Sequence, residues 1–298
     1  MKVLEVHNLN KSYGKKQVLY DVSFEINSGE ILGFIGPNGA GKTTTIKLIL
    51  GLQFADSGQV IINGHDISKD REKAILKVGA IVENPDMYQY LSGRTNLEMV
   101  ARLYKDVTKD RIEEVIKLVG LENRINDKVS KYSLGMRQRL GIAAALINKP
   151  NLLILDEPTN GLDPEGIKEL RELLKKLAKT EDVAVLISSH NLAELESFCN
   201  VVSIIQNGKV LKTSRVKDLK KNDNEYYLEL DKIDGIENLI KDYTKVKENV
   251  IKVLASKEEV ADLITKLVMD GFKIYECKMV EISLEEAFLQ MTGGNSID

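Results

Sequence analysis

The chain has 298 residues, of which 43% are hydrophobic and 29% are charged, and its formal net charge is −3. This length and composition suit two domains with buried cores and exclude a disordered tail. The near balance of charge excludes the strongly basic surface that non-specific nucleic-acid binding requires. Two cysteines, Cys199 and Cys277, are too few for a disulfide framework or a zinc site.

The first part of the chain alternates apolar, strand-like runs with segments of helical period. Strands are predicted at 31–35, 60–62, 152–155, 183–187 and 201–205, and helices at 44–50, 112–119, 136–147 and 167–177. This alternation predicts an α/β domain with a buried, mostly parallel sheet. Two Asn-Gly pairs, at 63–64 and 207–208, predict tight hairpins and therefore an antiparallel part beside that sheet.

A polar, charged stretch at 216–224 interrupts this pattern and predicts a domain boundary. We place the first domain at residues 1–220, with a net charge of +4, and the second at 221–298, with a net charge of −7. The second is predicted to be a small acidic α+β domain. Its expected strands are 226–230, 249–254 and 272–279, and its expected helices are 235–243, 257–269 and 283–291.

Residues 36–44 form a glycine-rich run that matches G-x-x-x-x-G-K-[ST]. In such a run backbone N–H groups close around phosphate oxygens, a lysine supplies positive charge, and a hydroxyl can bind Mg²⁺. A predicted strand before the run and a predicted helix after it favour nucleotide binding over a chance glycine turn. We call this run the phosphate cradle, and its predicted nucleotide-binding members are Gly36, Pro37, Asn38, Gly39, Ala40, Gly41, Lys42, Thr43 and Thr44.

Two adjacent acids, Asp156 and Glu157, directly follow the predicted strand 152–155. The first acid, Asp156, can hold Mg²⁺ together with Thr43. The second acid, Glu157, can orient or deprotonate an attacking water. His190 closely follows another predicted strand. Ligands of open α/β sheets bind at the carboxyl ends of strands, so these side chains should converge with the cradle if the strands are neighbours. His190 is then predicted to sense the γ-phosphate, with a plain helix-start position as the alternative.

Three motifs in a fixed order carry a family resemblance: the cradle, the sequence YSLGMRQR at 132–139, and the strand LLILDEP at 152–158. Together they resemble the nucleotide-binding subunit of an ATP-binding cassette (ABC) transporter over residues 1–220. The resemblance implies a P-loop NTPase fold with a parallel core sheet, an antiparallel β part and a helical subdomain. It also implies ATP and Mg²⁺ as ligands. Two copies would pair head to tail, with each ATP between the cradle of one and the signature motif, 132–139, of the other.

Residue by residue, the resemblance implies that Tyr13 stacks on adenine, with a surface tyrosine in a polar turn as the alternative. Ser133 and Gly135 would reach the γ-phosphate bound to the partner copy, and Ser133 also suits the N-cap of the helix predicted after it. Catalytic roles fall on Lys42, Glu157 and His190. Asp163 would either communicate across the dimer or cap a helix that begins at Pro164.

Three residues depart from the family pattern. Glu83 stands where the family has a glutamine near the magnesium and the membrane partner, and its carboxylate could itself ligate Mg²⁺. Leu134 replaces a glycine and Met136 replaces a glutamine in the signature motif. These features are most similar to the bacitracin and lantibiotic type of exporter subunit. The segment 283–293 resembles the closing segment of that exporter class, with an amphipathic capped helix as the alternative.

The resemblance therefore implies an ATP-hydrolysing subunit that energises efflux of a drug, an antimicrobial peptide or a similar compound. No apolar run approaches the roughly 20 residues that cross a bilayer, and the first residues lack a signal-peptide segment. We therefore expect a cytoplasmic protein, peripheral on the inner face of the cell membrane, with a separate membrane-spanning subunit. That subunit should dock near Glu83, Met87, Tyr88 and Leu91. Two alternatives stay open: the ATPase of an importer, and a soluble cassette protein acting on ribosomes or DNA.

Overall fold

The computed structural model describes residues 1–83, 85–240 and 242–292. Contacts divide these residues into two compact units, Met1–Val216 and 217–292. The boundary that we predict after residue 220 lies a few residues beyond this division. Gly293, which the exporter-like closing segment includes, lies outside the described residues.

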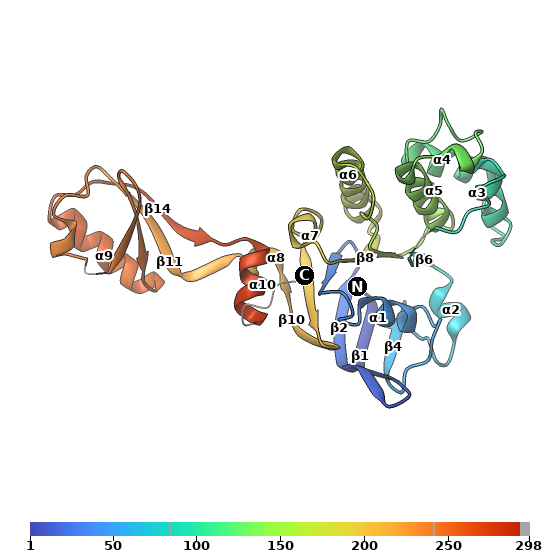
Figure 1. Cartoon of the computed structure of the whole chain (residues 1–298), viewed down its shortest axis with the longest axis horizontal. Helices are drawn as coiled ribbons and strands as arrows, with labels where there is room; N and C mark the ends of the chain where they lie inside the picture. Colours follow the sequence, from blue (N-terminus) through green and yellow to red (C-terminus); the bar gives the residue numbers. More distant parts are fainter. Residues whose placement is uncertain (84, 241, 293–298) are drawn as a thin grey trace. The chain divides into compact units, whose positions relative to one another are not determined.

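The first unit contains two sheets (Figure 1). Their strands are β1 Lys2–Tyr13, β2 Lys16–Asn27, β3 Ile31–Ile35, β4 Ser57–Ile62, β5 His65–Asp66, β6 Val78–Ile81, β7 Leu152–Asp156, β8 Ala184–Ser189, β9 Val201–Gln206 and β10 Lys209–Arg215. One sheet is antiparallel, in the order β2-β1-β4-β5. The other has the order β10-β9-β3-β8-β7-β6, and β10 is its antiparallel member. The predicted parallel core sheet with an antiparallel part is confirmed.

Helices complete the first unit. They are α1 Lys42–Ile49, α2 Arg71–Ile75, α3 Gly93–Ala101, α4 Lys109–Leu118, α5 Leu134–Leu146, α6 Pro164–Glu181 and α7 Leu192–Phe198, with a 3-10 turn at Val129–Lys131. The helices α3, α4 and α5 pack on one another and form the helical subdomain (Figure 1). The helices predicted at 112–119 and 167–177 correspond to α4 and to the interior of α6.

Both predicted Asn-Gly hairpins are present. Asn63 and Gly64 have φ values of 51° and 80°, and Asn207 and Gly208 have values of 49° and 75°. These are the left-handed conformations that type I′ turns require. The turns join the antiparallel pairs β4–β5 and β9–β10.

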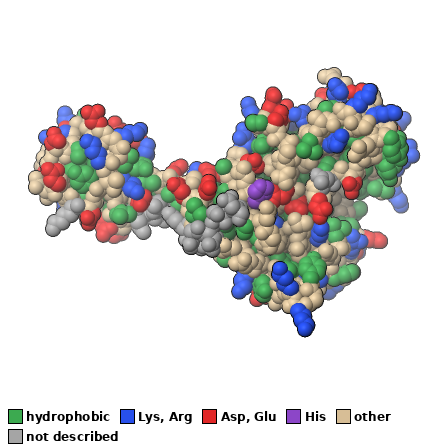
Figure 2. Space-filling view, viewed as in Figure 1, with side chains coloured by type: hydrophobic (Ala, Val, Ile, Leu, Met, Phe, Trp, Pro, Cys, Tyr) green, Lys and Arg blue, Asp and Glu red, His purple; other side chains and the backbone are tan. Residues whose placement is uncertain are grey.

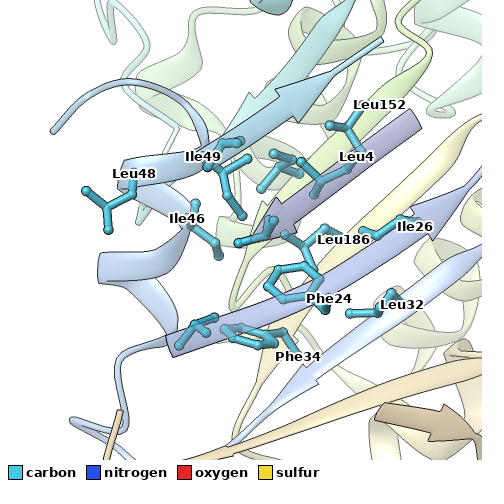
Figure 3. Packing of buried hydrophobic residues seen from close by; sticks show 14 of the residues in the cluster. Leu4, Phe24, Ile26, Leu32, Phe34, Ile46, Leu48, Ile49, Leu152 and Leu186 are labelled. Atoms are coloured by element: carbon cyan, nitrogen blue, oxygen red, sulfur yellow. The ribbon is translucent and has the colours of Figure 1, made fainter. Parts of the chain in front are cut away.

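A hydrophobic core lies between the two sheets and α1 (Figure 3). Its members include Leu4, Phe24, Ile26, Leu32, Phe34, Ile46, Leu48, Ile49, Leu152 and Leu186. The rings of Phe24 and Phe34 join the two sheets, with their centroids 5.2 Å apart. Burying one such side chain contributes about 1.5–3 kcal/mol. This core therefore fixes α1, and with it the cradle at the start of α1, against the sheets.

The second unit contains an antiparallel sheet in the order β12-β13-β11-β14. The helix α8 Val216–Leu219 begins at the last residue of the first unit. The further elements are β11 Lys221–Leu230, a 3-10 turn Ile236–Asn238, β12 Tyr243–Lys247, β13 Val250–Leu254, α9 Lys257–Met269, β14 Ile274–Glu281 and α10 Leu284–Thr292. Figure 1 shows α9 lying against this sheet. A capping box between Ser256 and Glu259 starts α9, which has the bounds predicted for it.

The helix predicted at 235–243 is wrong. Ile236 and Ile240 do have helical spacing and both are buried, but the only helical turn formed by the described residues of 235–243 is the 3-10 turn Ile236–Asn238, and Ile240 follows it. So short a segment gains too few hydrogen bonds to nucleate a longer helix. The chain instead enters β12 at Tyr243, where the alternating residues pair with β13.

Figure 2 shows acidic and basic side chains interspersed on the visible face of each unit. This mixture is the surface expected from the nearly neutral charge balance of the chain. Across residues 1–83, 85–240 and 242–292, no helix has the length and apolar character needed to span a membrane.

Candidate nucleotide-binding site

The predicted site residues follow three neighbouring strands. The order β3-β8-β7 places these parallel strands side by side, so their carboxyl ends lie at one edge of the sheet. The cradle follows β3, Glu157 follows β7, and His190 follows β8. The predicted convergence of these positions is confirmed.

The backbone of the cradle requires glycine at specific positions. A Cβ atom at Gly36 would lie 2.2 Å from the carbonyl oxygen of Ile205, and Gly41 has a left-handed φ of 110°. Gly41 is the N-cap of α1 and supplies no capping side chain, so the first N–H groups of the helix suit an anion. The helix begins at Lys42 rather than at the predicted Thr44, because Gly41 already turns the chain into the helix.

Lys42 lies at the centre of a chain of polar contacts. Its side chain is 6% exposed, and its Nζ atom donates to the carbonyl oxygens of Gly36, at 2.7 Å, and Pro37, at 3.3 Å. The same Nζ atom lies 3.3 Å from Oε1 of Glu157. The other oxygen of Glu157, Oε2, lies 2.8 Å from Nδ1 of His190. Thus one carboxylate connects the cradle lysine to His190, the predicted sensor of the γ-phosphate.

Asp156 is buried and takes part in a second set of contacts. Its Oδ2 atom accepts a hydrogen bond from the Thr43 hydroxyl at 2.9 Å, and its Oδ1 atom accepts one from the Ser188 hydroxyl at 2.6 Å. Carboxylate and hydroxyl oxygens are ligands that Mg²⁺ prefers. The donor set of Thr43 and Asp156 therefore fits this ion.

Ser188 is a site residue that the sequence analysis missed. Besides its bond to Asp156, its Oγ atom accepts a hydrogen bond from the Glu157 N–H at 3.0 Å. Glu157 has a left-handed φ of 49°, which is uncommon for a residue other than glycine. The signal was a pair of serines closing an apolar strand, a pattern too common to indicate a site.

Glu83, a predicted metal ligand, pairs with a residue other than Thr43 and Asp156. Its side chain is 65% exposed, and its Oε1 atom lies 2.8 Å from Nζ of Lys47 on α1. This hydrogen bond lowers the pKa of Glu83 below its ordinary value and raises the pKa of Lys47. Glu83 is therefore held ionised beside α1, and its role as a magnesium ligand stays a prediction.

Three further predicted residues belong to other local clusters. The Tyr13 hydroxyl hydrogen-bonds to Gln53, and Nζ of Lys11 lies 5.3 Å from the centre of the Tyr13 ring. Ser133 is the N-cap of α5, and its Oγ atom accepts a hydrogen bond from the Met136 N–H at 3.2 Å. A Cβ atom at Gly135 would lie 3.4 Å from a methyl group of Leu162. The predicted cap is confirmed, although α5 begins at Leu134 rather than at Met136 because that bond already orders its first turn. The nucleotide contacts of these three residues stay predictions.

Asp163 caps α6, as one of its two predicted roles required. Its Oδ1 atom accepts a hydrogen bond from the Gly166 N–H at 2.9 Å, and Pro164 occupies the first helical position. We expect Asp163→Ala to lower the free energy of unfolding by about 1 kcal/mol, because the capping acceptor is lost. Asp163→Asn keeps an acceptor and should retain most of that stability. Chemical denaturation of both variants measures the difference, and wild-type stability of Asp163→Ala would contradict the contribution of the cap.

Comparisons with known proteins identify relatives of this chain. A family model described as ABC transporter matches residues 19–160. The ABC transporter ATP-binding protein YhcH of Bacillus subtilis is 48% identical over 293 residues, which cover 98% of this chain and 96% of the relative. The chain belongs to the ATP-binding subunits of ABC transporters. The bacitracin transport ATP-binding protein BcrA of Bacillus licheniformis is another relative of this ABC subunit, 40% identical over 99% of both chains.

Solved structures confirm the ABC ATPase fold. The structure of an ATP-binding subunit of an ABC transporter covers 73% of this ABC subunit and 92% of its own chain, with 34% identity and a TM-score of 0.67. A dimeric ATP-binding cassette, MJ0796, bound to ADP and Pi covers 72% of this chain and 98% of its own, with 26% identity and a TM-score of 0.65. Because ABC ATPase domains bind ATP, ATP is the nucleotide of this ABC subunit.

Proposed function

We propose that this ABC subunit hydrolyses ATP with Mg²⁺ and thereby energises export through a separate membrane-spanning subunit. The observation that carries this proposal is the contact chain Lys42–Glu157–His190 beside the Thr43–Asp156 pair. These residues supply a cation for phosphate, a candidate base and oxygen ligands at one edge of the sheet.

The names of relatives support export as the coupled process. They include bacitracin transport protein BcrA, lantibiotic transport protein SrtF of Streptococcus pyogenes and linearmycin resistance protein LnrL of Bacillus subtilis. We infer that the cargo is an antimicrobial compound or a chemically similar molecule. These names favour export over the importer and the soluble cassette protein that the sequence left open.

The geometry supports a part in hydrolysis for five residues of the site. Thr43 and Asp156 would hold Mg²⁺, which neutralises charge on the phosphates. Lys42, which bonds backbone carbonyls here, gains a stronger, charged acceptor when a terminal phosphate enters the cradle. Glu157 orients water and takes its proton at a carboxylate oxygen, while His190 holds the other oxygen in place.

Pairing of two copies would complete each site. In the proposed head-to-tail dimer, Ser133 and Gly135 of one copy approach the ATP in the cradle of the other. Phosphate charge then needs donors from both copies, so closure depends on nucleotide, and hydrolysis removes the bridge. The exposed capped start of α5 supports this role because helix N-termini favour anions.

We propose that the membrane subunit docks on the surface around Glu83, Met87, Tyr88 and Leu91. Tyr88 is 51% exposed and packs edge-on against Tyr90, with 5.8 Å between the ring centroids. Met87 helps to line a neighbouring hollow of about 260 Å³. Exposed aromatic side chains beside a hollow suit a protein partner. Docking there would hold the ABC subunit on the cytoplasmic face of the membrane.

Co-purification tests the proposed function. We expect the tagged ABC subunit to be recovered from membranes with a polypeptide that has several hydrophobic spans. In lipid vesicles containing both, ATP hydrolysis should require Mg²⁺ and rise above that of the ABC subunit alone. Lys42→Ala is the control, since it should keep the partner and lose hydrolysis. Recovery with ribosomes or DNA instead of a membrane protein would contradict the proposal.

A further inference from the structure

The strand β14 forms one edge of the sheet in the second unit, and β11 is its neighbour. Its side chains are largely exposed, with Tyr275 at 65% and Glu276 at 51%. An edge strand presents unpaired N–H and C=O groups to which another strand can bond. We call residues 273–281 the β14 edge.

Hydrogen bonds of β11 show which backbone groups of β14 point outward. The Leu230 N–H donates towards β13, and the Asp231 N–H donates towards the start of β14. A register shift of β14 lies between the partners of Glu229 and Leu230, and the pairing is regular from Tyr226 to Glu229. Because N–H groups alternate sides along β11, the odd-numbered residues of this regular stretch bond to β14. Glu276 and Lys278 pair with odd-numbered residues of β11, so their N–H and C=O groups point inward. Those of Cys277, between them, point to the open edge.

The β14 edge is self-complementary about Cys277. Moving outward from that residue, the flanking pairs are Glu276 and Lys278, Tyr275 and Met279, Ile274 and Val280, and Lys273 and Glu281. If an antiparallel copy places Cys277 opposite Cys277, Glu276 faces Lys278 and Tyr275 faces Met279. The two outer pairs lie beyond the register shifts of β14, one between Ile274 and Glu276 and the other between Met279 and Glu281. Opposite-charge pairs and apolar pairs are the cross-strand contacts that stabilise sheets.

We propose that the β14 edges of two copies of this chain pair antiparallel about Cys277 and join the two sheets into one. A two-fold axis passes between the cysteines, so the contact is the same from both copies and closes as a dimer. No nucleotide takes part in it. The contact would keep two ABC subunits together while their ATP sites are open.

Repulsion between two acids of the sheet supports a second copy of the chain as the partner of the β14 edge. Glu276 lies directly opposite Glu229 of β11, and like charges at opposed positions destabilise a sheet. Lys278 of the same strand lies 3.3 Å from Glu276 and offsets part of this repulsion. A second copy adds another Lys278 directly opposite Glu276, so each acid gains a further base.

The other edge of the same sheet, β12, differs in its charge pattern. Its charged residues are Lys245 and Lys247, which have the same sign and are exposed. Self-pairing centred on Val246 places lysine opposite lysine, and lysines are a common protection of free edges. The charges of β14 alternate in sign instead and therefore match a second copy.

Cross-linking through Cys277 tests the contact directly. Cys199 is buried, which leaves Cys277 as the exposed thiol. Full-length protein, free of nucleotide and kept in EDTA, is treated with a short bismaleimide. Because partial burial raises the pKa of the Cys277 thiol, the reaction is run at mildly alkaline pH. We expect a cross-linked dimer whose joined peptides both contain Cys277, and its loss in Cys277→Ser.

Reversing the charges of Glu276 and Lys278 tests the register in which the two β14 edges pair. Lys278→Glu places acid opposite acid in both halves of the contact and should weaken dimerisation by roughly tenfold in sedimentation experiments. Adding Glu276→Lys restores opposite signs and should restore dimerisation. Lys245→Glu is the matched control, because it makes the same charge change on β12 and should leave the dimer unchanged.

Three results would overturn this proposal. They are a monomer under these conditions, a dimer that Lys278→Glu does not weaken, and a double variant that fails to recover. Assemblies that grow beyond the dimer would also overturn it, since they indicate β14 pairing with β12 in an open series. Because nucleotide is absent throughout, any of these results leaves the ATP-dependent pairing of the first unit untouched.

Discussion

ATP hydrolysis should fall by about 10²–10⁴-fold in Glu157→Gln, the range expected for loss of a general base. Glutamine keeps the size of the side chain and can still contact Lys42 and His190, but its amide cannot take a proton from water. ATP binding should therefore persist while turnover collapses. Phosphate release measures the first effect, and the nucleotide retained through gel filtration measures the second.

A matched control for this variant is Glu165→Gln on the exposed first turn of α6. It makes the same chemical change in the same part of the fold and should hydrolyse ATP at the wild-type rate. Wild-type turnover in Glu157→Gln would remove Glu157 from the role of base. In that case its contacts with Lys42 and His190 would only position those residues.

The second large effect is expected on ATP binding in Lys42→Ala. In the proposed site the buried ammonium group of Lys42 bonds to the terminal phosphates, and hydrogen bonds between charged groups contribute about 1.5–3 kcal/mol each. The dissociation constant of Mg·ATP should therefore rise by roughly 10- to 100-fold. Calorimetric titration with a non-hydrolysable ATP analogue measures this change separately from turnover.

The control is Lys73→Ala, which removes an exposed lysine that pairs with Asp70 on the surface. Its affinity for the analogue should match that of the wild type. Thermal unfolding of both variants shows that each is folded before binding is compared. Unchanged affinity in folded Lys42→Ala would count against the cradle as the phosphate site.

Much of the nucleotide site could be predicted from sequence because its residues directly follow buried parallel strands. The apolar runs at β3, β7 and β8 are short and continuous, and each ends at polar residues with a distinct chemistry. Glu83 shows the limit of this reasoning. Its partner Lys47 is distant in the sequence, and no local pattern marks that ion pair.

The fold errors have physical causes of the same kind. The long strands β1 and β2 were not predicted, although Val22, Phe24 and Ile26 of β2 are buried in alternation with exposed neighbours. Register shifts interrupt the pairing of the two strands. At 235–243 the apolar spacing is helical, yet only the 3-10 turn Ile236–Asn238 forms among the described residues. In both places tertiary packing decided between conformations that the local sequence allowed.

The hydroxyl of Ser188 links the two acids of the site to each other. It bonds to the carboxylate of Asp156 and to the main chain of Glu157, so one atom on a neighbouring strand connects two successive acids. That tether helps to maintain a backbone conformation of Glu157 that costs ~1–3 kcal/mol outside glycine. In the proposed site, a shift of the Asp156 carboxylate would move the hydroxyl that holds the main chain of Glu157. We therefore expect the two acids to respond together when the phosphate departs.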